Sequence, residues 1–349
     1  MAERKGRART TIQSSPTLDD VARLAGVSTA TVSRCLNSPQ QVVEDTRERV
    51  LAVVREIGYA PNFGARALAA KRTNTIGAII PTMENAIFAR GLQAFQEELG
   101  QHGFTLLVAS SSYRPDYEEE QIRTLLARGA DALLLIGFHR PSSAYAFLER
   151  RGVPFVVSWA YRQDAQVRSV GFDNRIAMRA LARRVVEFGH KRIAIVTAPC
   201  DVNDRARERV AGILEAASEV GLDIDAIRIE ETPYSIENGA AATHAVLSES
   251  EQRPTVVMCG NDVLAVGALR AAKSLGLHVP GDLSITGFDD IELAQIVEPC
   301  LTTVHVPHRE MGRQAAKAIS SLLRTEDVPQ NQCLEARVVL RESLGPAAS

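Results

Sequence analysis

The sequence predicts two parts of different fold class: a small all-α N-terminal domain, and an α/β body of two lobes that each hold a doubly wound parallel sheet. Up to residue 57, apolar side chains recur at helical spacing in short segments. From residue 75, β-branched runs alternate with amphipathic stretches, which is the pattern of parallel strands joined by crossover helices. These units outnumber what one compact sheet holds, so we predict two lobes with a cleft between their facing carboxyl strand ends.

The expected strands of the body are 76–80, 106–109, 132–136, 155–157, 193–197, 256–259 and 284–287. Helices are expected between them, including 88–99, 176–188, 210–220 and 263–275.

Composition predicts a globular cytoplasmic protein. The chain of 349 residues is 45% hydrophobic and 23% charged, and it has no apolar run long enough for a membrane span. Its basic N-terminus (Arg4, Lys5, Arg7, Arg9) is not followed by the apolar segment of a secretory signal. The five cysteines are scattered and never spaced as CxxC, which fits a reducing compartment and argues against structural zinc or disulfides. We therefore expect no metal, no cofactor and no membrane partner.

Charge is distributed unevenly along the chain. Residues 1–72 carry a net charge of +5 and the remainder carries −7, which together make the total of −2. A basic head on an acidic body indicates a module that neutralises phosphates joined to one that does not.

Two short helices and a turn are predicted in residues 17–36. Thr17 can cap the first helix, and Asp19 and Asp20 stand in its first turn, where the helix dipole favours carboxylates. Gly26 supplies the turn and Ser28 can cap the second helix, 29–36. This arrangement is a helix-turn-helix, whose second helix presents its N-terminal residues to base edges.

A third helix is expected at about 44–57. Its buried stripe would be Val50, Leu51, Val54 and Ile57, and Gly58 would end it.

The N-terminal domain resembles the lactose repressor family. The similarity rests on VARLAGVS at 21–28, TVSR at 31–34, TRERV at 46–50 and GYAPN at 58–62. One position departs from the family pattern, because Val43 stands where members place a capping residue and cannot accept the cap hydrogen bond.

The resemblance implies which side chains of the second helix meet DNA. Those implied to face bases are Thr29, Ala30 and Arg34, and those implied to fix the helix on phosphates are Ser28, Thr31, Ser33 and Asn37. Arg34 would read guanine through its bidentate fork. Cys35, in the middle of this helix, is expected to be small packing rather than a redox switch.

The segment after the headpiece resembles the family's hinge helix, which orders on the operator and packs against its dimer mate. Arg66 and Leu68 would contact the minor groove there, with Leu68 wedged into a base step. An ordinary interdomain linker with a helical turn is the alternative. The expected domains are a disordered basic arm at 1–16, the headpiece at 17–61, the hinge at 62–74, the body at 75–340 and a tail at 341–349.

The resemblance continues through the body. Asp173-Asn174, GHKRIAI at 189–195, Asn261-Asp262 and PGDLSITGFDD at 280–290 occur in family order. It implies lobes similar to periplasmic sugar-binding proteins. The N-lobe would comprise about 75–171 plus 302–331, and the C-lobe about 172–300 plus 332–340.

The same resemblance places an effector site between the lobes. The implied residues are Asn85, Phe88, Trp159, Arg205, Arg209, Tyr234, Asn261 and Asp289. Phe88 would be an apolar wall beside Asn85 and Ile87, and Tyr234 a stacking surface. Arg209 would be the bidentate donor, Arg205 a second positive charge, and Asn261 and Asp289 would bond ligand hydroxyls. Trp159, the one tryptophan, could be a second stacking surface or a lobe-interface residue.

The implied function is that of a repressor of a carbohydrate or sugar-acid operon, acting on the nucleoid and controlled by a small effector. SPQQV at 38–42 and SYRPDYEEEQ at 112–121 look most like the gluconate-operon branch, so a sugar acid such as gluconate is the first guess for the effector. The C-terminus has no leucine heptad, so we expect a homodimer on a pseudo-palindromic operator.

Two other classes of protein share parts of this pattern. An exported sugar-binding protein explains only the body, and a sugar-modifying α/β enzyme leaves the headpiece unused. The sequence has no GxxxxGK[ST], GxGxxG, GxSxG or HExxH motif, and His305 and His308 bracket Val-Pro and do not share a helix face. DNA retention that weakens steeply with salt discriminates a repressor from both.

Overall fold

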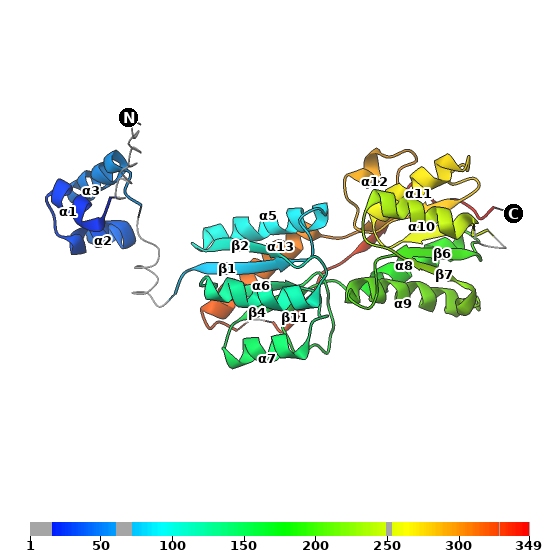
Figure 1. The fold of residues 1–349 in the computed structure, drawn as a ribbon, viewed down its shortest axis with the longest axis horizontal. Helices are drawn as coiled ribbons and strands as arrows, with labels where there is room; N and C mark the ends of the chain where they lie inside the picture. The colour runs from blue at the N-terminus through cyan, green and yellow to red at the C-terminus, as the bar shows by residue number, and fades with distance from the viewer. Residues whose placement is uncertain (1–15, 61–71, 249–252, 328, 349) are drawn as a thin grey trace, which may run out of the picture. The chain divides into compact units, whose positions relative to one another are not determined.

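The computed structural model describes residues 16–60, 72–248, 253–327 and 329–348, which form two compact units that divide between Thr73 and Asn74 (Figure 1). The expected basic arm, apart from Pro16, and the hinge residues Arg66 and Leu68 lie outside the described residues.

The first unit is all helical. It contains α1 (Leu18–Ala25), α2 (Thr29–Asn37), the 3-10 turn η1 (Pro39–Gln41) and α3 (Glu44–Ile57). Thr17 and Asp20 form a reciprocal capping box on α1, Gly26 makes the turn with φ 65°, and the Ser28 hydroxyl accepts from the backbone N–H of Thr31. The predicted helix-turn-helix is confirmed.

The core of this unit is small. Its buried side chains larger than alanine are Val21, Val32, Cys35 and Val50. Cys35 is therefore a packing residue, as expected. Of the expected stripe on α3, Val54 and Ile57 pack partly buried against the core. The prediction for Leu51 is wrong: Val53 packs on the core instead, because α3 turns its Val50–Val53–Val54–Ile57 face inward.

Val43 precedes α3 without a side-chain cap, and its side chain is 76% exposed. Its backbone is extended, with φ −58° and ψ 140°, so a residue with a side-chain oxygen could act as N-cap there without rearrangement.

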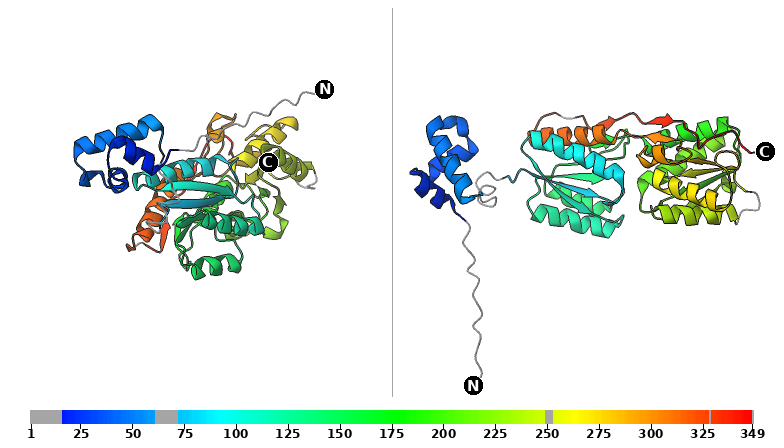
Figure 2. Two further views of the ribbon diagram at one scale, coloured as in Figure 1. Left: turned by 60° about the vertical axis from the view of Figure 1, so that its left-hand side comes forward. Right: turned by 90° about the horizontal axis from the view of Figure 1, so that it is seen from above.

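The first lobe of the body is a three-layer α/β structure. Its parallel sheet has the order β11-β5-β4-β3-β1-β2, formed by β1 (Thr75–Ile80), β2 (Thr105–Ser110), β3 (Ala132–Ile136), β4 (Phe155–Ser158), β5 (Ser169–Gly171) and β11 (Asn331–Cys333). The helices α5 (Ala86–Gln101) and α13 (His308–Leu323) cover one face, and α6 (Pro115–Ala127) and α7 (Ser142–Arg150) cover the other (Figures 1 and 2).

The second lobe repeats this design with a four-stranded parallel sheet. The order is β7-β6-β8-β9, formed by β6 (Ile193–Thr197), β7 (Arg228–Glu231), β8 (Val256–Cys259) and β9 (Ser284–Thr286). On one face lie α8 (Asn174–Glu187) and α9 (Asp204–Glu219), and on the other α10 (Ile236–Ser248), α11 (Asp262–Ser274) and α12 (Leu293–Ile296). A short 3-10 turn, η2 (Ile224–Ala226), precedes β7. The predicted fold class, two doubly wound lobes, is confirmed.

The lobes are joined by an antiparallel pair, β10 (Thr303–His305) and β12 (Arg337–Val339). Isolated bridges tie Thr302 to Thr286 and His305 to Asp289, so the chain leaves the second lobe only after His305, a few residues later than the sequence suggested. The segment 341–348, expected as a tail, packs on the second lobe. The backbone of Ser343 forms hydrogen bonds with the backbones of Ile285 and Cys300, and its side chain is buried.

Both sheets reverse direction of winding at a central strand, β1 in the first lobe and β6 in the second. Loops diverge at the carboxyl ends of such strands and leave room for a ligand. The residues predicted for the effector site all follow strand ends, so they belong to the loops at this edge of the two sheets.

Replacing Val43 with Ser should stabilise the start of α3. A serine hydroxyl can accept from the backbone N–H of Asp45 or Thr46, a contact worth about 0.5–2 kcal/mol. Hydrogen–deuterium exchange of these amides in the full chain should slow in Val43→Ser and not in Val43→Ala. Equal exchange in the two variants would show that the missing cap has no cost.

Candidate functional site

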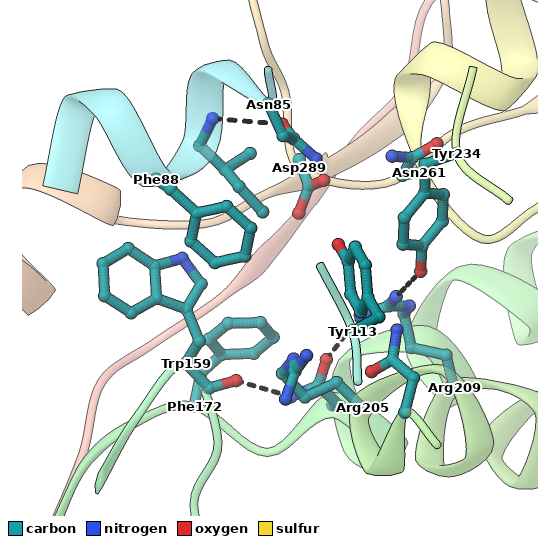
Figure 3. A pocket seen from close by; sticks show the side chains of 13 residues that line it. Asn85, Phe88, Tyr113, Trp159, Phe172, Arg205, Arg209, Tyr234, Asn261 and Asp289 are labelled. Carbon is teal, nitrogen blue, oxygen red and sulfur yellow. Dashed lines mark hydrogen bonds between the residues drawn. The ribbon is translucent and has the colours of Figure 1, made fainter. Parts of the chain in front are cut away.

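A pocket between the lobes gathers side chains from the loops that follow the strands (Figure 3). Its cavity volume is about 20 Å³, and it is lined by all eight residues expected for the effector: Asn85, Phe88, Trp159, Arg205, Arg209, Tyr234, Asn261 and Asp289. Ile87 also lines it, and four further residues were not predicted: Tyr113, Phe172, Asn174 and Asn203.

The first lobe supplies an apolar wall. Phe88 and Trp159 are each 2% exposed, and their ring centroids lie 5.5 Å apart at 53° (Figure 3). Asn85 caps α5 through its side-chain oxygen, which accepts from Ile87 N at 3.2 Å and fixes the start of the helix beside the pocket.

Trp159 lies both in the pocket and at the interface between the lobes, the two positions that the sequence left open. Its ring lines the pocket, while its backbone carbonyl accepts from Asn174 Nδ2 of the second lobe at 3.1 Å. It has φ 60°, a left-handed backbone that is rare for a bulky residue. Its indole Nε1 is buried without a partner among the described residues.

Arg209 forms the cationic floor of the pocket. Its Nη1 donates to Asn174 Oδ1 at 2.8 Å, and its Nη2 donates to the Tyr234 hydroxyl at 2.7 Å. The guanidinium also lies 4.9 Å from the centroid of the Phe288 ring. The fork expected for a ligand is therefore held by two protein groups, and the buried Nε has no partner among the described residues.

Arg205 has a different role from the free second charge that the sequence suggested. Its Nη1 donates to Asp204 Oδ1 at 2.9 Å and to the backbone oxygen of Ile136, in the first lobe, at 3.3 Å. Asp204 Oδ2 in turn accepts from Phe138 N, also in the first lobe, at 2.6 Å. The intervening Gly137 has φ 70° and no space for a Cβ, so these contacts need glycine. The ion pair neutralises Arg205 and ties the lobes together.

Asp289 supplies a buried carboxyl to the pocket. Its residue is 6% exposed, and its carboxylate forms no hydrogen bond with any described residue. Burial raises the pKa of Asp289 well above its ordinary value, and only the charges of Arg209 and Arg205 oppose this. A buried carboxyl without a partner favours a ligand that donates hydrogen bonds to it.

Asn261 lines the same pocket, and its side-chain oxygen already has a partner in the protein. Its Oδ1 accepts from Leu264 N at 2.9 Å and caps α11. Its amide nitrogen has no recorded partner among the described residues, so it remains a donor for a ligand acceptor.

Three of the four unpredicted residues carried a usable sequence signal. Asn174 belongs to the Asp173-Asn174 motif, and Asn203 is the N-cap of α9, directly before Asp204 and Arg205. Tyr113 follows strand β2 just as the predicted residues follow other strands.

The seven DNA-contact candidates occupy the solvent side of the headpiece. Those exposed are Ser28, Ala30, Arg34 and Asn37, and those half-buried are Thr29, Thr31 and Ser33. Thr31 accepts or donates a 2.9 Å bond with Ser28, and Asn37 Nδ2 donates to Ser33 Oγ at 3.2 Å. No described residue forms an ion pair with Arg34, so its guanidinium is available to an external acceptor.

Comparison with known proteins identifies the combination of headpiece and body. Residues 17–62 match the family described as bacterial regulatory proteins, lacI family, and residues 182–344 match a periplasmic binding protein-like domain. The chain is 31% identical over 331 residues to the HTH-type transcriptional repressor PurR of Klebsiella pneumoniae (strain 342), covering 94% of this chain and 96% of that repressor. The chain belongs to the lacI family.

Further relatives support this assignment. The HTH-type transcriptional repressor CytR of Escherichia coli (strain K12) is 32% identical over 332 residues, which is 95% of this chain and 97% of CytR. The crystal structure of the lac repressor dimer bound to operator and the anti-inducer ONPF has a TM-score of 0.85 and 28% identity, and the match covers 95% of this chain and 100% of that chain. This member of the family is therefore a ligand-responsive, DNA-binding transcriptional repressor, and it is not an enzyme.

Within the described ranges, no helix is long and apolar enough to cross a bilayer, and no three His, Cys, Asp or Glu side chains are grouped to bind a metal. His305 and His308 instead serve the loop below the pocket. His305 Nδ1 pairs with Asp290 Oδ2 at 2.9 Å, and His308 Nε2 donates to the backbone oxygen of Asp289 at 3.1 Å. Burial lowers the pKa of His308 to about 4, so the ring is neutral.

Asp262 holds this loop from beneath. Its Oδ1 accepts from the Thr303 hydroxyl at 2.6 Å and its Oδ2 accepts from Ile291 N at 2.9 Å. Burial raises the pKa of Asp262 from 3.8 to about 7, against the two hydrogen bonds that favour the anion. The folded body therefore keeps a proton on Asp262 that the unfolded chain releases at much lower pH.

Asp262 should make the body less stable as pH rises. The unfolded chain loses this proton near pH 4 and the folded chain near pH 7, so the free energy of unfolding falls between these values and is level above them. The loss is on the order of 4 kcal/mol, since one pKa unit corresponds to about 1.4 kcal/mol.

Denaturant unfolding of Asp262→Asn at about pH 5 and pH 8 should show a smaller difference than the parent shows. The control is Asp282→Asn, whose carboxylate is 52% exposed and pairs with His278. It should leave the decline above pH 5 unchanged. A decline as steep in Asp262→Asn as in the parent would contradict the buried proton.

Proposed function

We propose that this repressor controls genes for the use of a carbohydrate or related sugar acid, and that the effector binds in the pocket between the lobes of the body. The observation that carries the proposal is the unpartnered Asp289 carboxyl facing Arg209 in a largely aromatic pocket. Carboxylates and guanidinium groups bond the hydroxyls of a polar ring, while aromatic faces pack on its apolar side.

The pocket has groups for a neutral ring and for an anionic one. Asp204 neutralises Arg205, while Arg209 bonds Asn174 and Tyr234 and no carboxylate among the described residues. Burial raises the pKa of Asp289 well above its ordinary value, so its carboxyl favours a protonated form that can donate to a ligand hydroxyl as well as accept from it. A sugar would bond these groups through its hydroxyls, and a sugar acid such as gluconate would place its carboxylate at Arg209.

We further propose that the dimer reads a pseudo-palindromic operator with α2 in the major groove. Arg34, Thr29 and Ala30 would contact bases, and Ser28, Thr31, Ser33 and Asn37 would position the helix on phosphates. Their positions on α2 and at its N-cap, each exposed or half-buried, support this assignment. The minor-groove roles of Arg66 and Leu68, in residues outside those described, remain predictions, as does association with the nucleoid in the cytoplasm.

Selection of operator from random double-stranded DNA tests the whole proposal. The full-length chain should enrich pseudo-palindromes, and its affinity for them should fall steeply as salt rises. Thermal-shift screening of sugars, sugar acids and nucleobases should then find a sugar or sugar acid that stabilises the chain and changes operator affinity. Enrichment without symmetry, or stabilisation only by compounds unrelated to sugars, would contradict the respective parts.

Arg34→Ala should weaken binding to the selected operator by about 1–3 kcal/mol and relax the sequence preference at one position of each half-site. The matched control is Arg49→Ala, which removes an exposed arginine of α3 paired with Asp45. It should lower affinity little and leave sequence preference unchanged. If both variants lose affinity equally on all sequences, Arg34 is a phosphate contact and not a base reader.

A further inference from the structure

Arg140 is a charged residue inside the first lobe. It follows β3 in the chain, and its side chain is fully buried, with an exposed fraction of 0%. Its ion-pair partner is Glu118 of α6, whose Oε1 accepts from Nε at 3.3 Å and from Nη2 at 3.1 Å. Pro141, the next residue, restricts the backbone of Arg140 to extended conformations. Because burying a guanidinium is costly unless its donors are bonded, its remaining partners show what else it holds.

The other bonds of Arg140 go to the loop that follows β3. Its Nη2 donates to the backbone oxygen of Gly137 at 2.9 Å and to that of Ile136 at 3.4 Å. Its Nη1 donates to the hydroxyl of Tyr145 in α7, and this hydroxyl donates to the backbone oxygen of Phe138 at 3.0 Å. Arg140 therefore holds three consecutive carbonyl groups, two of them directly and one through Tyr145.

The same three residues receive the second lobe. The backbone oxygen of Ile136 accepts from Arg205 at 3.3 Å, and the backbone N–H of Phe138 donates to Asp204 at 2.6 Å. Gly137, between them, has φ 70° and lies so close to Arg205 Nη1 that a Cβ would overlap it. The buried guanidinium in the first lobe and α9 in the second therefore hold one loop, 136–138.

The two sets of contacts are also coupled electrostatically. Burial works to raise the pKa of Asp204, yet this pKa lies below its ordinary value. The charge of Arg205, the N–H of Phe138 and the charge of Arg140 favour the anion. The Asp204 carboxylate thus keeps the negative charge that strengthens its hydrogen bond across the lobes.

We propose that Arg140 is a positioning residue of the effector response: from inside the first lobe it fixes the loop 136–138 in the shape that α9 binds, and so sets the arrangement of the two lobes. Arg140 is not among the described residues that line the effector pocket. It acts through α9, which carries Arg209 about one turn beyond Arg205. This rests on the proposed function, since it assumes that the effector binds between the lobes.

The amide of Phe138 reports the contact without any ligand, because it donates to Asp204 across the lobes. Its hydrogen–deuterium exchange is measured in the full-length chain. Asp204→Ala removes the acceptor, so it should speed this exchange about tenfold or more and give the reference for a broken contact. Arg140→Met should approach that rate. Tyr145→Phe, which keeps the ring and removes one bond of the loop, should speed exchange less.

Arg123→Met is the matched control, since it removes another arginine that pairs with a glutamate of α6, Glu119, but is 51% exposed. It should leave exchange at Phe138 unchanged. In all these variants the amides of Ala78 and Leu134, which pair in the centre of the sheet, should stay as protected as in the parent.

Parent-like exchange at Phe138 in both Arg140→Met and Tyr145→Phe would overturn the proposal. So would an equal loss of protection at Ala78 and Leu134 in both variants, because Arg140 would then only stabilise the lobe. If Arg140→Met does not fold, Tyr145→Phe decides between these outcomes alone.

Operator affinity tests whether the loop matters to the repressor. On the operator obtained by selection, with no ligand added, Arg140→Met and Asp204→Ala should change affinity in the same direction, by about fivefold or more. The double variant should show no more than the larger single change, because both substitutions break one contact. Additive changes, or parent-like affinity in both single variants, would overturn the proposal. Failure of the parent to enrich any operator would instead count against the proposed function.

Discussion

The first two turns of α9 hold the body together and equip its pocket. Asp204 and Arg205 reach across to Phe138 and Ile136 of the first lobe, while Arg209, one turn further, forms the cationic floor beneath Asp289. Because one rigid helix carries both sets of contacts, a ligand that pulls Arg209 also acts on the tie between the lobes. The ligand shifts the lobes toward whichever arrangement it binds more tightly, and this decides between an inducer and a corepressor.

Arg209 has hydrogen-bond partners within the protein, whereas the carboxyl of Asp289 has none among the described residues. Asn174 and Tyr234 accept hydrogen bonds from two nitrogens of Arg209, so the buried cation has partners within the protein. Asp289 has no such substitute, and its raised pKa is the electrostatic consequence. A ligand hydroxyl that bonds Asp289 would remove a cost already present in the folded chain, which makes binding energetically favourable there.

Sequence periodicity predicted most strands within one residue of their observed ends, because buried parallel strands are dense in β-branched residues. The eight effector candidates also meet in one pocket, since each follows the carboxyl end of a strand. The sequence could not predict which side chains pair with each other. The residues around Arg205 do not show that Asp204 neutralises it, and those around Tyr113 do not show that a left-handed turn places this ring in the cleft. Leu51 was misplaced because four apolar residues in one helix leave its rotation ambiguous by one position.

The most direct measurement of this account is the operator affinity of the full-length chain with and without its stabilising ligand, in the parent and in Arg209→Met. Methionine keeps much of the apolar bulk but removes the guanidinium. We predict that both proteins bind operator alike without ligand, and that ligand changes the affinity of the parent only. A ligand effect of equal size in Arg209→Met would contradict the central role of α9.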